Sequence, residues 1–288
     1  MQDLSNINTV KNILSKYGFT FSKALGQNFI INPSICPKIA EMGYAEKGTG
    51  IIEIGSGIGV LTAQLASRAD KVVCIEIDDR LLPILNETLA EFDNIKIIND
   101  DVLNVDLCKI ISEEFNSKPV SVCANLPYYI TSPILLYLLK SKLPIKAITV
   151  MVQKEAAVRI CAKPGSKDFG ALSVAVQYYS DPKILFNVSR GNFIPAPEVD
   201  SCVIRLNILS TPRVITLDED FFFETVKAAF SQRRKALVNS ISSYFGVNKS
   251  LLIQPFETNS INPKIRPEQL TLEEFNKLSE IIKELVIK

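Results

Sequence analysis

The sequence contains no histidine, and its 32 basic and 31 acidic residues almost cancel. Without histidine the chain has no Ser-His or Cys-His nucleophile system, and a metal site would lack one of its commonest ligands. The six cysteines are scattered with no Cys-x-x-Cys pair, and several fall in apolar runs. We therefore expect no metal centre, and cysteines that serve as small buried residues in a reducing cytoplasm.

Long apolar runs are also missing, since none approaches the roughly 20 residues that span a bilayer. The first residues, Met-Gln-Asp-Leu-Ser, have neither a basic start nor an apolar stretch, so no signal peptide is expected. These absences predict a cytoplasmic protein with no membrane partner. Because the net charge is only +1, any nucleic-acid binding must depend on a local basic patch.

The chain does contain a regular alternation of strand-like and helix-like segments between residues 51 and 209. Strands are expected near 51–54, 71–76, 95–98, 119–124, 146–152, 183–188 and 201–209. Helices are expected near 60–68, 80–92, 106–115 and 132–140, with further helix in 154–180. This order predicts an α/β fold in which a parallel sheet is covered on both faces.

Domain boundaries follow from where this alternation begins and ends. Residues 1–50 are expected to be helical and loop-like, and the pattern changes to helices only after residue 209. We therefore predict a large domain, 1–209, with its sheet core at 51–209, and a small all-α domain, 210–288. The length of 288 residues is sufficient for one large and one smaller domain.

A glycine-rich turn follows the first apolar strand, with Gly55, Gly57 and Gly59 at alternate positions. Glycines there allow a sharp turn and a close approach by a ligand, although many dinucleotide enzymes share this pattern. Glu76 ends the next strand, 21 residues after Gly55, where an acid can accept hydrogen bonds from ribose hydroxyls. Glu53, just before the glycines, makes a nicotinamide-dependent oxidoreductase an unfavoured alternative.

The sequence Asn-Leu-Pro-Tyr at residues 125–128 follows another expected strand. The side-chain oxygen of Asn125 and the backbone carbonyl of Leu126 can accept hydrogen bonds from an exocyclic amine. Tyr128 offers a ring for stacking, and Asp101, at the end of a third strand, can accept from an adenine amine. Ligands of open α/β sheets bind at the carboxyl ends of strands, where these side chains should meet. The alternative for residues 125–128 alone is an ordinary proline-containing loop.

Several segments together resemble the KsgA (RsmA) family of ribosomal RNA adenine dimethyltransferases, which use S-adenosylmethionine. They are residues 25–30, 53–62, 76–78, 101–103, 125–128, 169–174, 193–205 and 230–235. The glycine motif is shared by many methyltransferases. Gln-Asn-Phe at 27–29 with Asn-Leu-Pro-Tyr narrows the resemblance to enzymes of rRNA adenine N6. Phe-Ser-Gln-Arg-Arg-Lys at 230–235 favours the KsgA branch over resistance enzymes that modify large-subunit rRNA.

The resemblance implies a Rossmann-like class I methyltransferase domain with S-adenosylmethionine as cofactor. It implies a cofactor site formed by Asn28, Ile30, Gly55, Gly57, Glu76, Asp101 and Asn125. Asn125 and Leu126 would hold the target amine, and Tyr128 and Phe193 the target base, although Phe193 is equally expected to be a core aromatic. Two departures from the family pattern are Tyr129, where many members carry Asn, and Ile30, where Leu is usual.

The family's substrate is a pair of adjacent adenosines near the 3′ end of 16S rRNA, each of which receives two methyl groups during 30S assembly. The resemblance implies this substrate here. The sequence does not give the oligomeric state, and a monomer is the default expectation. Arg233, Arg234 and Lys235 form the expected RNA-binding patch, or else an ordinary solvated face. Three alternatives stay open: a methyltransferase of 23S rRNA, one of DNA adenine, and an assembly factor that acts mainly by binding.

Overall fold

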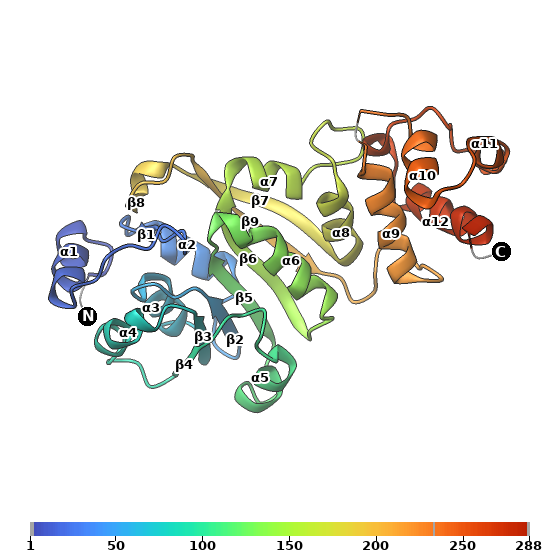
Figure 1. The fold of residues 1–288 in the computed structure, drawn as a ribbon. Coiled ribbons are helices and arrows are strands. Elements are labelled where there is room, and N and C mark those ends of the chain that lie inside the picture. The colour runs from blue at the N-terminus through green and yellow to red at the C-terminus, as the bar shows by residue number, and fades with distance from the viewer. Residues whose placement is uncertain (1–2, 233, 287–288) are drawn as a thin grey trace. The chain divides into compact units, whose positions relative to one another are not determined.

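The computed structural model describes residues 3–232 and 234–286 (Figure 1). By their internal contacts these residues form two compact units. The first contains the chain up to Ala157 together with Pro182–Ile208, and the second contains Val158–Asp181 and the chain from Leu209 onward. The second unit thus includes a segment, 158–181, that the predicted division assigned to the sheet domain.

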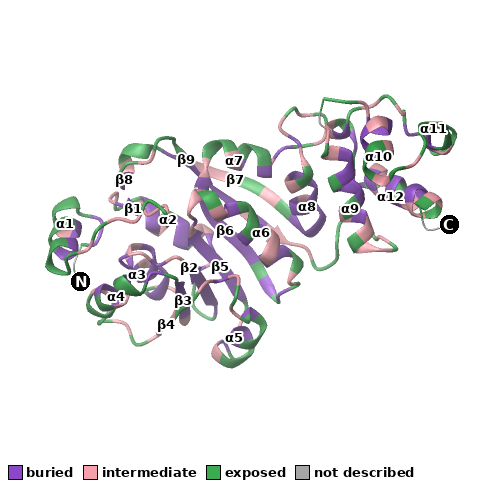
Figure 2. Ribbon diagram, in the orientation of Figure 1, coloured by how far each residue is buried: buried purple, intermediate pink, exposed green. Residues whose placement is uncertain are grey.

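The first unit is built on a seven-stranded sheet with the strand order β4-β3-β2-β5-β6-β9-β7. The strands are β2 (Gly50–Ile54), β3 (Lys71–Glu76), β4 (Ile95–Asn99), β5 (Val120–Asn125), β6 (Ile145–Gln153), β7 (Ser180–Val188) and β9 (Ser201–Ile208). All seven strands lie at the predicted positions. The central strands β2, β3 and β5 are almost fully buried, as in parallel sheets covered on both faces (Figure 2).

The sheet is mixed, so the prediction of a parallel sheet was wrong at β9. Strands β4, β3, β2, β5 and β6 are parallel to their neighbours, but β9 runs antiparallel to β6. A parallel return needs a crossover connection, usually a helix. The link between β7 and β9 holds only the 3-10 turn η3 (Arg190–Asn192) and the two-residue strand β8 (Phe193–Ile194).

Helices follow β2, β3, β4 and β5 as predicted, and two more lie in the segment 1–50, which was expected to be helical and loop-like. They are α1 (Ile7–Lys16), α2 (Ile35–Met42), α3 (Val60–Ala66), α4 (Leu82–Thr88), α5 (Leu107–Glu114) and α6 (Thr131–Lys140). Side chains from α2 and α3 pack on β2 and β3 in one core cluster that contains Ile39, Leu65 and Ile51. The helix α7 (Lys154–Ile160) begins in this unit and ends in the second.

A short strand pair fixes the segment that precedes the sheet. Strand β1 (Phe29–Ile30) pairs antiparallel with β8, with Ile30 opposite Phe193. Beyond the pair, the Ile31 amide donates to the Asn192 carbonyl (2.9 Å). Neither strand was predicted, because two residues are too few to show a strand periodicity. The pairing holds residues 25–31 at the carboxyl edge of the sheet.

The second unit is helical apart from its edge residues. It contains α8 (Ala171–Tyr179), α9 (Glu219–Phe230), α10 (Leu237–Phe245), α11 (Lys249–Thr258) and α12 (Leu272–Val286). Aromatic contacts join α8 to α9: the ring centroids of Tyr178 and Phe222 lie 5.2 Å apart, and those of Tyr179 and Phe223 lie 5.7 Å apart. These contacts explain why 158–181 groups with the C-terminal helices. Gly246 ends α10 in a left-handed conformation (φ +69°), at the predicted stop.

Candidate active site

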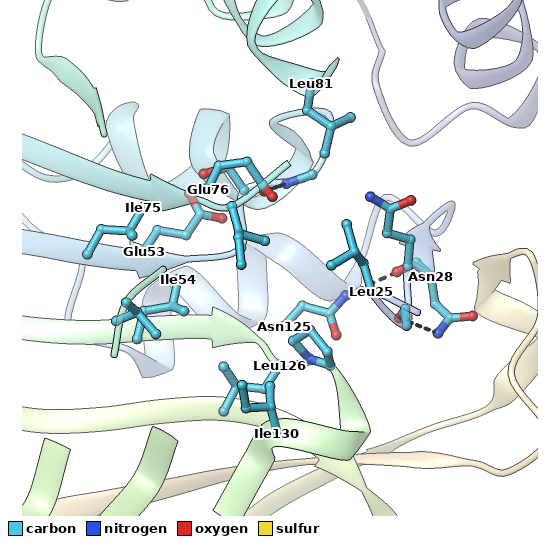
Figure 3. A pocket seen from close by; sticks show the side chains of 18 of the residues that line it. Leu25, Asn28, Glu53, Ile54, Ile75, Glu76, Leu81, Asn125, Leu126 and Ile130 are labelled. Carbon is cyan, nitrogen blue, oxygen red and sulfur yellow. Dashed lines mark hydrogen bonds between the residues drawn. The ribbon is translucent and has the colours of Figure 1, made fainter. Parts of the chain in front are cut away.

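A cleft opens at the carboxyl ends of β2, β3 and β5 (Figure 3). Its empty volume is about 1080 Å³, including the part that is open to solvent. Four segments of the first unit line it: residues 25–30, 53–61, 75–81 and 125–134, with 100–102 at one side. Strand ends that are far apart in the sequence therefore meet in one cleft, as predicted for Gly55, Glu76, Asp101 and Asn125.

The glycine turn forms the floor of the cleft. Gly55 and Gly57 adopt positive φ angles of +75° and +58°, which favour glycine. A Cβ atom at Gly57 would lie 3.1 Å from the Phe29 ring, closer than the ring tolerates without moving. A Cβ atom at Gly55 would have only the Asn125 carbonyl near it, at 4.0 Å, so a side chain there would project into the cleft.

Glu76 presents a buried carboxylate at the end of β3. Its Oε2 accepts from the Gly57 amide and its Oε1 from the Asp78 amide, both at 3.0 Å. Burial raises the pKa of Glu76, and the two backbone donors partly oppose this effect. Each carboxylate oxygen has two lone pairs, so the group can accept from a ligand as well as from the glycine turn.

Two aspartates that follow β4 lie at the side of the cleft. Asp100 and Asp101 both line it, directly after β4. Asp101 Oδ1 accepts from the Leu103 amide (3.0 Å), and Asp100 Oδ1 accepts from the Asp101 amide (2.7 Å). These bonds fix the turn, so that Asp101 lies where the sequence predicts it.

The segment before β1 forms the wall opposite the strand ends. Asn28 and Ile30 line the cleft, as the resemblance implies. Gln27 Nε2 donates to Asp78 Oδ2 (2.6 Å), which ties this segment to the end of β3. Asn28 Nδ2 donates to the Gly26 carbonyl (3.0 Å), which fixes the loop internally.

Asn125 joins that wall to β5. Its Nδ2 atom donates to the Asn28 carbonyl (3.1 Å), so its Oδ1 atom is the end of the amide left to accept from a ligand. The following amide, of Leu126, donates to the Met151 carbonyl of β6 (3.2 Å). Leu126 is 2% exposed, and Asn125 and Leu126 both line the cleft, as predicted.

Tyr128 is half-buried at the start of the 3-10 turn η2 (Tyr128–Ile130) and lines the cleft. Its hydroxyl is hydrogen-bonded to that of Ser201, at 2.7 Å. Burial raises the pKa of the phenol, and the Ser201 contact opposes this only in part. The ring is thus neutral and held at its far end, a suitable state for stacking.

Phe193 does not line the cleft. It is 4% exposed and packs in the core cluster with Ile30 and Val188, which agrees with its alternative role as a core aromatic. Of the expected RNA-binding residues, Arg234 and Lys235 are exposed in the turn that follows α9. Arg233 lies outside the described residues.

Glu53 and Tyr129 also line the cleft, but the sequence analysis assigned neither a role in the site. Glu53 is 1% exposed, and burial raises its pKa to about 8, although the Cys74 thiol donates to its Oε2 (3.5 Å). Its position before the glycines was the available signal. Tyr129 lines the mouth of the cleft and is 59% exposed, and its departure from the family pattern was the only signal.

The cleft fits S-adenosylmethionine by its chemistry. The bare backbone at Gly55 leaves room for a ligand, and the Glu76 and Asp101 carboxylates can accept from ribose hydroxyls and an amine. Apolar side chains complete the lining and can cover an adenine ring: Leu25, Ile54, Ile75, Leu81 and Ile130 (Figure 3).

Comparisons with known proteins agree with this geometry. A model of the family described as "Ribosomal RNA adenine dimethylase" matches residues 18–284. The chain is 49% identical over 280 residues to "Ribosomal RNA small subunit methyltransferase A" of Alkaliphilus oremlandii, covering 97% of this chain and 98% of the relative. It is 50% identical over 285 residues to the protein of the same name from Bacillus cytotoxicus, with 97% of each covered.

Two solved structures share the fold. A dimethyladenosine transferase from Plasmodium falciparum has a TM-score of 0.70 at 23% identity, covering 90% of this chain and 98% of its own. The 23S rRNA methyltransferase ErmE has a TM-score of 0.68 at 24% identity, covering 89% and 100%. These likenesses confirm the predicted Rossmann-like fold with a helical C-terminal region. The family model and the two sequence relatives show that the chain belongs to the ribosomal RNA adenine dimethylase family.

Proposed function

We propose that this protein transfers methyl groups from S-adenosylmethionine to the N6 amines of two adjacent adenosines near the 3′ end of 16S rRNA. Each adenosine would receive two methyl groups, in the cytoplasm, on a small-subunit assembly intermediate bound by one copy of the protein. The similarity to relatives named for the small subunit, at 49–50% identity over nearly the whole chain, supports this target over 23S rRNA.

The observation that carries the proposal is the orientation of the Asn125 amide. Because Nδ2 donates a hydrogen bond to the Asn28 carbonyl, Oδ1 is left to accept one N6–H of a target adenine. The Leu126 carbonyl, held before Pro127, is the second acceptor. Two acceptors on the two N–H bonds favour a tetrahedral nitrogen whose lone pair is free to form the new bond.

The remaining site residues bind the cofactor and orient the target adenine. Glu76, Asp101, Asn28 and the glycine turn hold the cofactor, which when bound supplies an electrophilic methyl group on a sulfonium. Tyr128 stacks on the adenine that has left its helix. Alignment of the two reactants accounts for much of the rate, since well-oriented groups can recover roughly 7–11 kcal/mol of the barrier. The proton that N6 loses passes to water, so no histidine is required.

The test is transfer of labelled methyl groups to unmodified small subunits, large subunits and bare rRNA, followed by mass analysis of the nucleosides. We expect N6,N6-dimethyladenosine on small-subunit particles. Label on large subunits instead would move the activity to 23S rRNA. Absence of transfer, with the cofactor still bound, would favour a factor that acts by binding.

A further inference from the structure

Tyr129 is the most exposed side chain of its size at the mouth of the cleft, and the proposed mechanism does not use it. It belongs to η2, whose other members also line the cleft. Successive residues of a 3-10 helix project about 120° apart, because the helix has three residues per turn. Tyr128 and Tyr129 therefore cannot stack on the same base. Tyr128 is held by Ser201, whereas 59% of Tyr129 is open to solvent.

The Tyr129 ring lies beside Gly26, close enough that any side chain at position 26 would touch it. A Cβ atom at Gly26 would lie 3.4 Å from Cδ1 and 3.5 Å from Cε1 of the ring, in van der Waals contact. Gly26 has a positive φ of +60°, and its carbonyl accepts from Asn28 Nδ2. The side chain of the neighbouring Gln27 donates a hydrogen bond to Asp78. The ring thus lies beside a loop that these hydrogen bonds hold in place.

The position of the ring indicates which ligand covers it. The carboxylates suited to the cofactor lie at the last residue of β3 and just after β4. Tyr129 instead follows β5, four residues after the Asn125 acceptor. A base that enters the cleft leaves its stack, so its neighbour in the strand loses a stacking partner. An aromatic side chain at the mouth can replace that partner, because base–aromatic stacking is independent of base identity.

We propose that Tyr129 is a substrate-binding residue that stacks on the nucleotide next to the target adenosine. This inference rests on the proposed function, since it requires an RNA strand with one base in the cleft. Tyr128 and Tyr129 then hold two consecutive nucleotides of the same strand, one inside the cleft and one at its mouth.

The test compares Tyr129→Ala and Tyr129→Phe with the wild type on small subunits. We expect Tyr129→Ala to raise KM and the Kd for the particle about 5- to 150-fold, which corresponds to about 1–3 kcal/mol of stacking. Tyr129→Phe should stay within about threefold, because its ring can still stack. The Kd of both variants for S-adenosylmethionine should stay within about twofold of wild type, which also shows that the site is folded.

Ile184→Ala is the matched control, because Ile184 is an exposed side chain of the same unit, 43% accessible, outside the cleft lining. An unchanged KM and particle Kd in Tyr129→Ala would overturn the inference. So would a loss of cofactor affinity with normal particle binding, which would make Tyr129 a cover for the cofactor. If the wild type binds particles without transferring methyl groups, the proposed function fails. The Kd of Tyr129→Ala for the particle would still show whether this ring binds RNA.

Discussion

The two ends of the Asn125 amide serve different purposes, and this division can be tested at a single side chain. The nitrogen donates to the Asn28 carbonyl in the wall of the cleft, and in the proposed reaction the oxygen accepts from the substrate amine. Asn125→Ala should lower kcat roughly 100- to 1,000-fold, the usual effect of removing one preorganised group. Steady-state transfer to small subunits measures this effect. Asn104→Ala, an exposed asparagine outside the cleft lining, is the control. A kcat within a few-fold of wild type would remove Asn125 from the mechanism.

Glu76 holds the glycine turn and is expected to hold the ribose. Glu76→Ala should weaken S-adenosylmethionine binding by roughly 1.5–3 kcal/mol, the scale of hydrogen bonds to charged groups. Titration calorimetry measures the affinity. Glu76→Gln keeps the volume and one acceptor oxygen, so its loss should be smaller. Equal affinity in the alanine variant and the wild type would contradict the ribose assignment.

Whether the position of a residue could be predicted from the sequence depended on its local structure. Gly55, Glu76 and Asn125 could be predicted because each lies at the end of an apolar strand, and strand ends meet at one edge. The position of Phe193 could not be predicted, because an aromatic beside a two-residue strand has the same local sequence whether it faces the core or the cleft. The closeness of Tyr129 to Gly26 could not be predicted either, because the two residues are distant in the sequence.

Among the helices and strands, those that are long and buried were predicted most accurately. The central strands carry continuous apolar runs and were placed within a residue or two. The direction of β9 was missed because it depends on whether a crossover helix precedes the strand, and not on its own residues. The grouping of 158–181 with the C-terminal helices was missed because it results from tertiary contacts of Tyr178 and Tyr179.

The turn after α9 is the element through which RNA binding can be tested. Arg234 and Lys235 are exposed there. The double variant Arg234→Glu, Lys235→Glu should bind small subunits more weakly, and its salt dependence should flatten, because each lost phosphate contact lowers the log–log slope by about 0.7–0.9. Lys227→Glu, an exposed lysine of α9, is the control for charge alone. Parallel salt curves for the double variant and wild type would make this turn an ordinary solvated surface.

For the molecule as a whole, the described residues contain no helix long and apolar enough to cross a membrane. The stability of the protein should depend on pH through a buried carboxyl group that lines the cleft, that of Glu53. Glu53 lies in β2 among buried neighbours from three elements: Cys36 of α2, Cys74 of β3 and Cys123 of β5. The nearby acid Glu76 also disfavours its ionised form, in addition to burial.

The pKa of Glu53 is about 8 in the fold, compared with an ordinary value of 4.5. Between these values the unfolded chain has released this proton and the folded chain has kept it. Stability must therefore fall as the pH rises through this range, by up to about 1.4 kcal/mol per pH unit from this group, and the fall should end above pH 8. Glu53→Gln keeps the shape without the ionisation, so its advantage over the wild type should grow from pH 5 to pH 8.

Urea unfolding followed by circular dichroism at several pH values measures this difference. If the two compact units unfold in separate transitions, only the transition of the first unit should respond, because β2 belongs to it. Glu46→Gln, at an exposed carboxyl of the same unit, should follow the wild-type curve. A constant difference between Glu53→Gln and wild type across the range would mean that Glu53 is ionised in the fold. The cleft would then carry the negative charge of Glu53 at neutral pH.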